Sequence, residues 1–155
     1  MTNVVRNLRI GISLLAIALV GFSALTTLAV TRPFHLVEHG TLSVDKDGNL
    51  VADGTGTATH LGRFTLRREA TLKPSEDGSG LVDVVGRATL TAANGDQLES
   101  SIKGTLNPRT GKAVLIYEWE GGTGLFQNAT GTTVWLVQVN SDQTYDVVAD
   151  GIIDY

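Results

Sequence analysis

The chain contains no cysteine in its 155 residues, and this absence excludes disulfide bonds, thiolate nucleophiles and cysteine-ligated metals. Proline is scarce, with three residues against 18 glycines, which favours many tight turns between short elements. Basic side chains are in the minority: ten face sixteen acidic ones from Arg32 onward, a net charge of −6. Because nucleic-acid binding needs a dense basic surface, we expect no nucleic-acid partner.

An uncharged apolar run lies near the N-terminus. It extends from Ile10 to Val30, about 21 residues, and roughly 20 apolar residues span a bilayer as a helix. The apolar region of a secretory leader is usually only about 7–15 residues long, and the nearest cleavage pattern, at residues 27–29, matches A-x-A poorly. We therefore expect an uncleaved transmembrane helix, or signal anchor, over residues 10–31. A cleaved leader is the alternative; a buried soluble helix fits less well because the run has no polar stripe.

The charges around this run predict its orientation. Arg6 and Arg9 precede it, and basic residues favour the cytoplasmic side of a membrane. Residues 1–9 are then cytoplasmic, and residues 32–155 form an extracytoplasmic domain that is periplasmic in a Gram-negative bacterium. The sequence thus predicts a single-pass inner-membrane protein whose partners are the lipid bilayer and other membrane protein subunits.

The rest of the chain, whose length favours one domain, shows the alternation of apolar and polar residues that is typical of half-buried strands. Turn signals such as Asn94-Gly95 separate the segments, and Gly54 and Gly56 predict a bulge or bend. No amphipathic helical segment follows the apolar run. We expect an all-β domain, an eight-stranded antiparallel up-and-down barrel, with a two-sheet sandwich as the alternative. The expected strands are 34–44, 50–62, 63–73, 81–92, 97–106, 112–120, 132–140 and 145–155.

One glycine-bracketed stretch, GGTGLFQNATG at residues 121–131, interrupts this alternation. It resembles the element G-T-G-R-F-x-x-A-T-G of bacterial barrel proteins that are similar to plant allene oxide cyclases and, more distantly, to dirigent proteins. The stretches GTGTATHLGRFTL (54–66) and GRATLTAANGDQL (86–98) extend the resemblance over most of residues 34–155. It implies an eight-stranded antiparallel barrel, and the family's largely apolar cavity implies binding or cyclisation of a small apolar molecule.

Within this stretch, the glycines are interpreted as a structural turn made by Gly122, Gly124 and Gly131. We expect one helical turn over residues 125–129, with Phe126 closing one end of the barrel or contacting a ligand at its mouth. Leu125 stands where the family usually has arginine.

Chemistry-bearing groups are few. The candidate ligand-binding residues are four aromatic side chains, Tyr117, Trp119, Phe126 and Trp135. His35 and His39 lie four apart, which on a strand separates them by about 13 Å. Even with His60 nearby, we expect no metal site, and no other motif predicts a cofactor.

Whether two carboxylates point into the barrel or outward depends on which face of their strand is buried. If Tyr117 and Trp119 face inward, Glu118 and Glu120 face outward; in the opposite register Glu118 enters an apolar interior as an acid or base. Glu38 is a weaker candidate for the same role.

Two functions fit these observations best. The first is a membrane-anchored, non-enzymatic accessory barrel that packs against a larger membrane complex. The alternative is a secreted barrel, similar to allene oxide cyclases, that binds or cyclises a small apolar molecule. A purely structural surface module is a third. Because no catalytic constellation stands out, the sequence favours a protein that is not an enzyme, and the predicted set of catalytic residues is empty.

Overall fold

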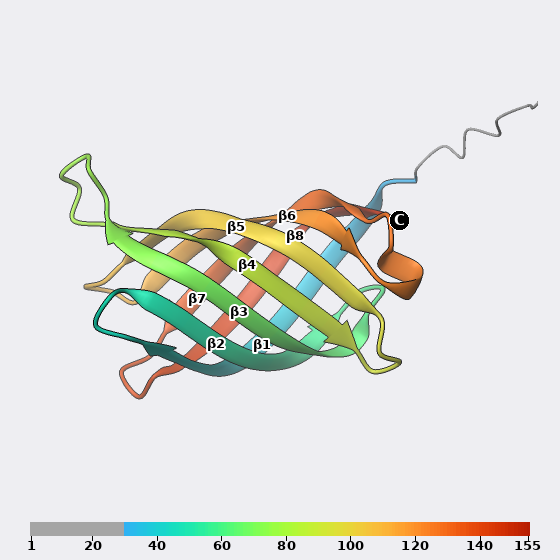
Figure 1. The fold of residues 1–155 in the computed structure, drawn as a ribbon, viewed down its shortest axis with the longest axis horizontal. Helices are drawn as coiled ribbons and strands as arrows, with labels where there is room; N and C mark the ends of the chain where they lie inside the picture. Colours follow the sequence, from blue (N-terminus) through green and yellow to red (C-terminus); the bar gives the residue numbers. More distant parts are fainter. Residues whose placement is uncertain (1–29) are drawn as a thin grey trace, which may run out of the picture.

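The computed structural model describes residues 30–155, which form a closed barrel of eight antiparallel strands (Figure 1). Each strand pairs with its neighbours in sequence, and β8 pairs with β1 to close the cylinder. The predicted all-β barrel is confirmed, and the sandwich alternative is wrong. The strands are β1 (Arg32–Val44), β2 (Asn49–Ala58), β3 (Gly62–Pro74), β4 (Val82–Ala92), β5 (Gln97–Asn107), β6 (Lys112–Gly122), β7 (Thr130–Val139) and β8 (Thr144–Asp154).

The predicted membrane segment lies almost wholly outside this part of the chain, as does the cytoplasmic segment 1–9. Between residues 30 and 155, none of the helices is long and apolar enough to cross a bilayer.

Strand alternation explains the barrel interior. Along β3, for example, Phe64, Leu66, Arg68 and Ala70 are buried, while the residues between them are exposed. Period-two alternation lets a closed sheet bury one side of every strand and solvate the other. The buried side chains are aliphatic or aromatic apart from four: Glu38, Arg68, Ser100 and Thr133.

Two expectations about β2 are wrong. The strand ends at Ala58 rather than continuing to residue 62, because a turn at residues 59–61 intervenes, with His60 at a φ of 74°. Of the bulge or bend predicted at Gly54 and Gly56, the bulge is absent, since β2 pairs in continuous register with both neighbours. The irregular register lies instead between β5 and β6.

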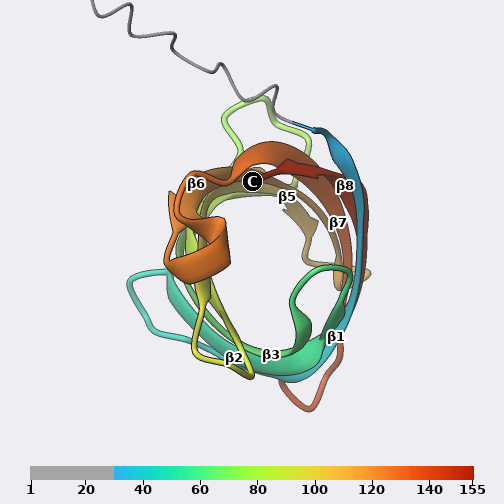
Figure 2. The ribbon, with the colours of Figure 1, turned by 90° about the vertical axis from the view of Figure 1, so that its right-hand side faces the viewer.

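The two ends of the barrel differ. The η1 end, seen in Figure 2, holds the short 3-10 helix η1 (Gly124–Phe126), the loops 59–61, 93–96 and 123–129, the start of β1 and the C-terminus. The helical turn predicted over residues 125–129 is a shorter 3-10 turn over Gly124–Phe126, which starts one residue earlier and ends three residues earlier. The opposite end holds the loops 45–48, 75–81, 108–111 and 140–143.

Candidate functional site

Four polar side chains from four strands meet inside the barrel, and we call them the interior cluster: Glu38 of β1, Arg68 of β3, Tyr117 of β6 and Tyr145 of β8. The Tyr145 hydroxyl donates a hydrogen bond to Oε1 of Glu38. Nε of Arg68 donates to the hydroxyl of Tyr117. Nη2 of Arg68 lies 3.5 Å from Oε2 of Glu38. The cluster is therefore one connected chain from Tyr117 to Tyr145 through a buried ion pair.

Burial dominates the electrostatics of the interior cluster. Its four residues are between 0 and 4% exposed. Burial raises the pKa of Glu38, and the nearby Arg68 guanidinium and the Tyr145 hydrogen bond only partly oppose that rise. Burial likewise raises the pKa values of Tyr117 and Tyr145, so both hydroxyls keep their protons. For Arg68, burial acts against the charge, but Tyr117 and Glu38 outweigh it and raise its pKa, so it stays cationic.

Two inward-facing glycines make room for this cluster. A Cβ on Gly54 would collide with Oε1 of Glu38 and with the Tyr145 hydroxyl. A Cβ on Gly40 would lie 2.7 Å from the same hydroxyl. Gly40 in β1 and Gly54 in β2 therefore mark positions where side chains of the interior cluster approach the backbone closely, and not a bulge.

Aromatic rings enclose the charged pair. Tyr117 stacks on Trp135, with ring centroids 3.9 Å apart and an interplanar angle of 7°. The Arg68 guanidinium lies 5.6 Å from each of these two ring centroids and 5.2 Å from that of Tyr145. Such cation–π contacts compensate part of the cost of burying the cation.

Three of the four aromatic residues singled out from the sequence share the interior. Tyr117, Trp119 and Trp135 face inward, and Trp119 also packs on Phe34 with centroids 5.1 Å apart. Phe126 is buried at the η1 end, where its ring meets Tyr155 at 5.3 Å. The candidate ligand-binding set is therefore divided between the centre of the barrel and one end.

The glycines of the predicted turn lie where β6 leads through η1 into β7. Gly124 has a φ of +56° and Gly131 one of +132°, conformations that favour glycine. A Cβ on Gly122 would collide with the carbonyl oxygen of Gln97 on β5, and one on Gly124 with the Asp96 carboxylate.

The carboxylates of β6 face solvent. Glu118 pairs with Lys103, and Glu120 pairs with Arg87. The register that places Glu118 inside the barrel is therefore wrong, and the interior carboxylate is Glu38. Sequence reasoning ranked Glu38 low and missed Arg68 and Tyr145. The available signal was a charged residue at an inward position of an alternating strand, as for Arg68 between Leu66 and Ala70.

The histidines lie apart on the surface. Nδ1 of His35 is 2.7 Å from Oδ1 of Asp150, Nε2 of His39 is 3.5 Å from Oγ1 of Thr55, and Nε2 of His60 is 2.9 Å from the carbonyl oxygen of Pro33. Residues 30–155 contain no group of three or more potential metal-ligating side chains.

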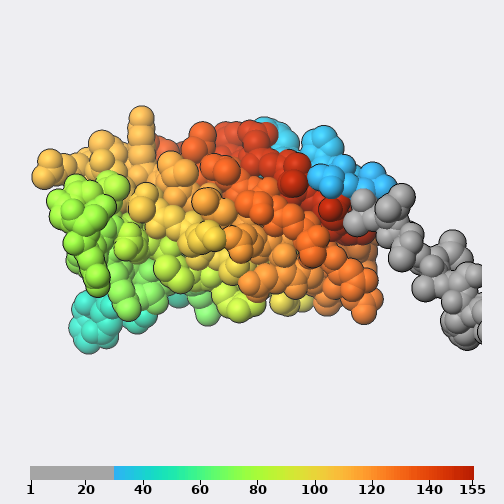
Figure 3. Space-filling view, turned by 90° about the horizontal axis from the view of Figure 1, so that it is seen from above, coloured from blue at the N-terminus to red at the C-terminus, as the bar shows by residue number. Residues whose placement is uncertain are grey.

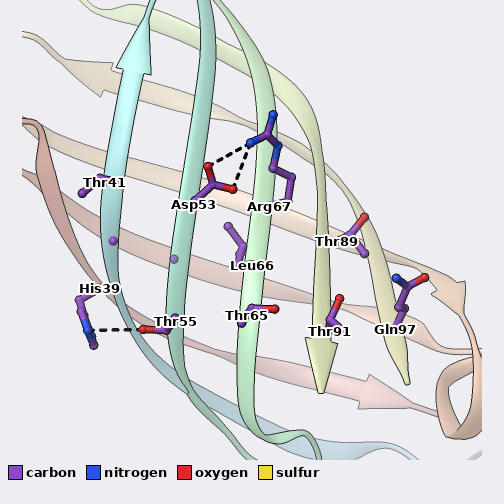
Figure 4. A pocket seen from close by; sticks show the side chains of 12 residues that line it. His39, Thr41, Asp53, Thr55, Thr65, Leu66, Arg67, Thr89, Thr91 and Gln97 are labelled. Atoms are coloured by element: carbon purple, nitrogen blue, oxygen red, sulfur yellow. Dashed lines mark hydrogen bonds and ion pairs between the residues drawn. The ribbon is translucent and has the colours of Figure 1, made fainter. Parts of the chain in front are cut away.

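A shallow groove of about 710 Å³ runs over the outer face of β1 to β5 (Figure 4). Its lining is polar and rich in threonine. Arg67 crosses it to pair with Asp53 at 3.0 Å, and both side chains are more than half exposed. The two groups are paired at the surface, and Asp53 raises the pKa of the Arg67 guanidinium, so Arg67 stays charged and cannot act as an acid or base.

The outer face of β6, β7, β8 and β1 is different, and Figure 3 shows much of this side of the molecule in orange, red and blue. Four aliphatic residues lie in register across these strands: Val114, Leu136, Val148 and Val37. Each is between 43 and 57% exposed. We call this set the apolar row.

No protein-family model matches this chain, and no curated protein matches it. The resemblance to allene oxide cyclase-like barrels therefore stays a prediction that depends on the sequence stretches quoted above.

Proposed function

We propose that this protein is a non-enzymatic accessory barrel, held at the outer side of a membrane by residues 10–31, that packs against another membrane protein through the apolar row. The observation that supports this best is the contrast between the two sides of the barrel wall. The polar groups of the interior are buried and engaged with one another, whereas the apolar row leaves a contiguous aliphatic band on the outside.

The charged groups of the interior are buried and paired. Glu38 and Arg68, the only charged side chains buried among residues 30–155, are engaged with each other and with Tyr117 and Tyr145. Acid–base catalysis needs a group within hydrogen-bond reach of the substrate. A molecule would have to displace packed side chains before it met Glu38.

The exposed aliphatic side chains of the outer face support the binding of a partner. Outward positions of a solvated strand are usually polar, as they are in the threonine-lined groove over β1 to β5. Contiguous exposed apolar surface marks interaction sites on soluble domains. One member of the apolar row, Val37, belongs to β1, the strand that directly follows segment 10–31. Val37 is only about 16 Å along this strand from Arg32. A protein in the same membrane therefore lies within reach of it.

Site-specific photocrosslinking in the native membrane tests this proposal. The photoreactive residue p-benzoylphenylalanine replaces Leu136 in the apolar row, and Thr65 on the opposite outer face serves as the matched control. We expect one adduct of fixed mass from position 136, whose second chain is an integral membrane protein, and none from position 65. No adduct from 136, or equal adducts from both positions, would contradict the proposal.

A second candidate is an allene oxide cyclase-like barrel that binds or cyclises a small apolar molecule. The interior cluster favours it, since a buried ion pair is generally less stabilising than apolar packing and perturbed titratable groups gather at functional sites. The end opposite η1 exposes part of an aliphatic lining. Its partly buried residues are Leu42, Leu50, Leu72, Leu106 and Val139.

Titration with the fluorescent fatty acid cis-parinaric acid tests this second candidate. A ligand that enters between the leucines should bind saturably at one site, and Leu72→Lys should weaken that binding at least tenfold. Leu125→Lys, at the η1 end, is the control and should leave the affinity unchanged. Absence of saturable binding would exclude this class of ligand.

A further inference from the structure

The loops at the two ends of the barrel differ sharply in charge. The four loops opposite η1 carry seven charged side chains, five of them acidic: Asp45, Lys46, Asp47, Glu76, Asp77, Arg109 and Asp142. The three loops of the η1 end carry one, Asp96. That carboxylate is already bound locally, accepting hydrogen bonds from the side chain of Asn94 at 3.0 Å and the backbone N–H of Leu125 at 3.2 Å.

The η1 end exposes apolar side chains where the other end exposes carboxylates. Leu125 is 56% exposed although it belongs to η1, and Val30 and Ile152 are about half exposed. The aromatic ring of Tyr155 lies beneath the Arg32 guanidinium, which is 4.3 Å from its centroid. Aliphatic residues flanked by an aromatic ring and arginine suit the boundary between lipid headgroups and acyl chains.

The chain itself brings this end to the membrane. β1 begins at Arg32, so a membrane segment ending at residue 31 leaves no linker between bilayer and barrel. The opposite end lies on the order of 30 Å further along the barrel axis. The end whose loops carry one charged side chain is therefore the one that the tether holds nearest the lipid, and Figure 1 shows η1 and the start of β1 at the same end.

We propose that the η1 end rests on the lipid surface, with Leu125 inserted at the headgroup boundary and the acidic end pointing away. This inference rests on the proposed function, because it assumes the tether. Arg32, the first residue of β1, and Arg63, the second residue of β3, lie at this end and meet anionic headgroups favourably. The five acidic loop residues of the other end would be repelled by the same headgroups.

The lack of cysteine makes a direct test possible, since one introduced cysteine is then the only labelling site. The full chain is reconstituted into vesicles of phosphatidylcholine and phosphatidylglycerol, with an environment-sensitive nitrobenzoxadiazole label on Leu125→Cys or, as the matched control, on Ser79→Cys in the loop 75–81. Leu125 and Ser79 are both exposed, so neither label should disturb the fold.

We expect a blue-shifted emission and strong quenching by headgroup-labelled nitroxide lipids at position 125, and neither effect at position 79. Equal emission and quenching at both positions, in chains that sediment with the vesicles, would overturn the orientation while leaving the tether intact. Chains that remain in the supernatant would overturn the tether and the orientation together.

Discussion

Nη2 of Arg68 lies 3.5 Å from Oε2 of Glu38 inside the barrel, and neither atom has a hydrogen-bond partner within residues 30–155. The two groups are thus an ion pair held by charge and by their other contacts rather than by a direct hydrogen bond. Two charges that leave water regain that cost only with good geometry and full hydrogen bonding. The intact pair therefore adds little net stability to the barrel, whereas loss of one partner leaves the other charge buried and uncompensated.

We expect an asymmetry between single and double substitutions of the ion pair. Arg68→Met leaves the Glu38 carboxylate buried without its partner and should lower the free energy of unfolding by about 3–5 kcal/mol. The double variant E38M/R68M should recover most of that loss. Arg67→Met, which removes an exposed pair with Asp53, should cost only about 0–1 kcal/mol. Urea denaturation of the four proteins measures these differences, and equal costs for R68M and R67M would contradict the account.

The stability of the protein should also depend on pH through Glu38. Because its pKa is higher in the folded state than in the unfolded chain, Glu38 contributes stability at low pH, and that contribution is lost as the pH rises through the folded pKa. Glu38→Gln cannot titrate. The free energy of unfolding of the native protein should therefore fall relative to that of E38Q as the pH rises from about 4.

Denaturation of the native protein and E38Q at a series of pH values provides the measurement. A gap that widens in favour of the native protein with rising pH would show that Arg68, not burial, controls the carboxylate.

Gly54 is predicted to be intolerant of any side chain. In Gly54→Ala the new methyl group collides with the Glu38 carboxylate and the Tyr145 hydroxyl, so the cluster must shift, at a cost of about 1–3 kcal/mol for overpacking. Gly78→Ala is the control: its Cβ meets nothing within 4 Å, and its φ of +72° should cost only about 1 kcal/mol. Thermal unfolding compares the two, and a smaller loss for G54A than for G78A would contradict the packing described.

The apolar row should matter for association and little for folding. Leu136→Ser and Val148→Ser change half-exposed side chains on the outer face, so each should alter the free energy of unfolding by no more than about 0.5 kcal/mol. Both should nevertheless abolish co-purification with the membrane partner in mild detergent. Thr65→Ser and Thr91→Ser, on the other outer face, are the matched control pair. A protein that co-purifies unchanged after L136S/V148S would show that the partner binds elsewhere.

The alternation of apolar and polar residues along the chain explains why most of the fold is predictable from the sequence. Alternation in β3 and the Asn94-Gly95 turn determine strands and hairpins, and hairpin order leads directly to a closed barrel. The face that holds Phe64 and Arg68 together was also predictable, because a period of two assigns every second residue to one side. The error at Gly54 arises because glycine marks bulges and close approaches alike.

The interior cluster was harder to predict because its members are far apart in sequence. Glu38 and Tyr145 are separated by 107 residues and meet only because β8 closes on β1. Alternation indicates that both point inward, but it does not indicate which inward side chains share a level of the barrel. The aromatic residues of β6 lie close together within an apolar strand, which indicates a buried position. Tyr145 lies at the start of β8 next to a loop, where this signal is weaker.

The intact mass of the protein recovered from the membrane fraction of its native host tests the central claim most directly. A tethered accessory barrel should require detergent for extraction and should carry all 155 residues, at 16.4 kDa before modification. A polypeptide trimmed near residue 30 and recovered without detergent would contradict the tether, and with it the proposed partner in the same membrane.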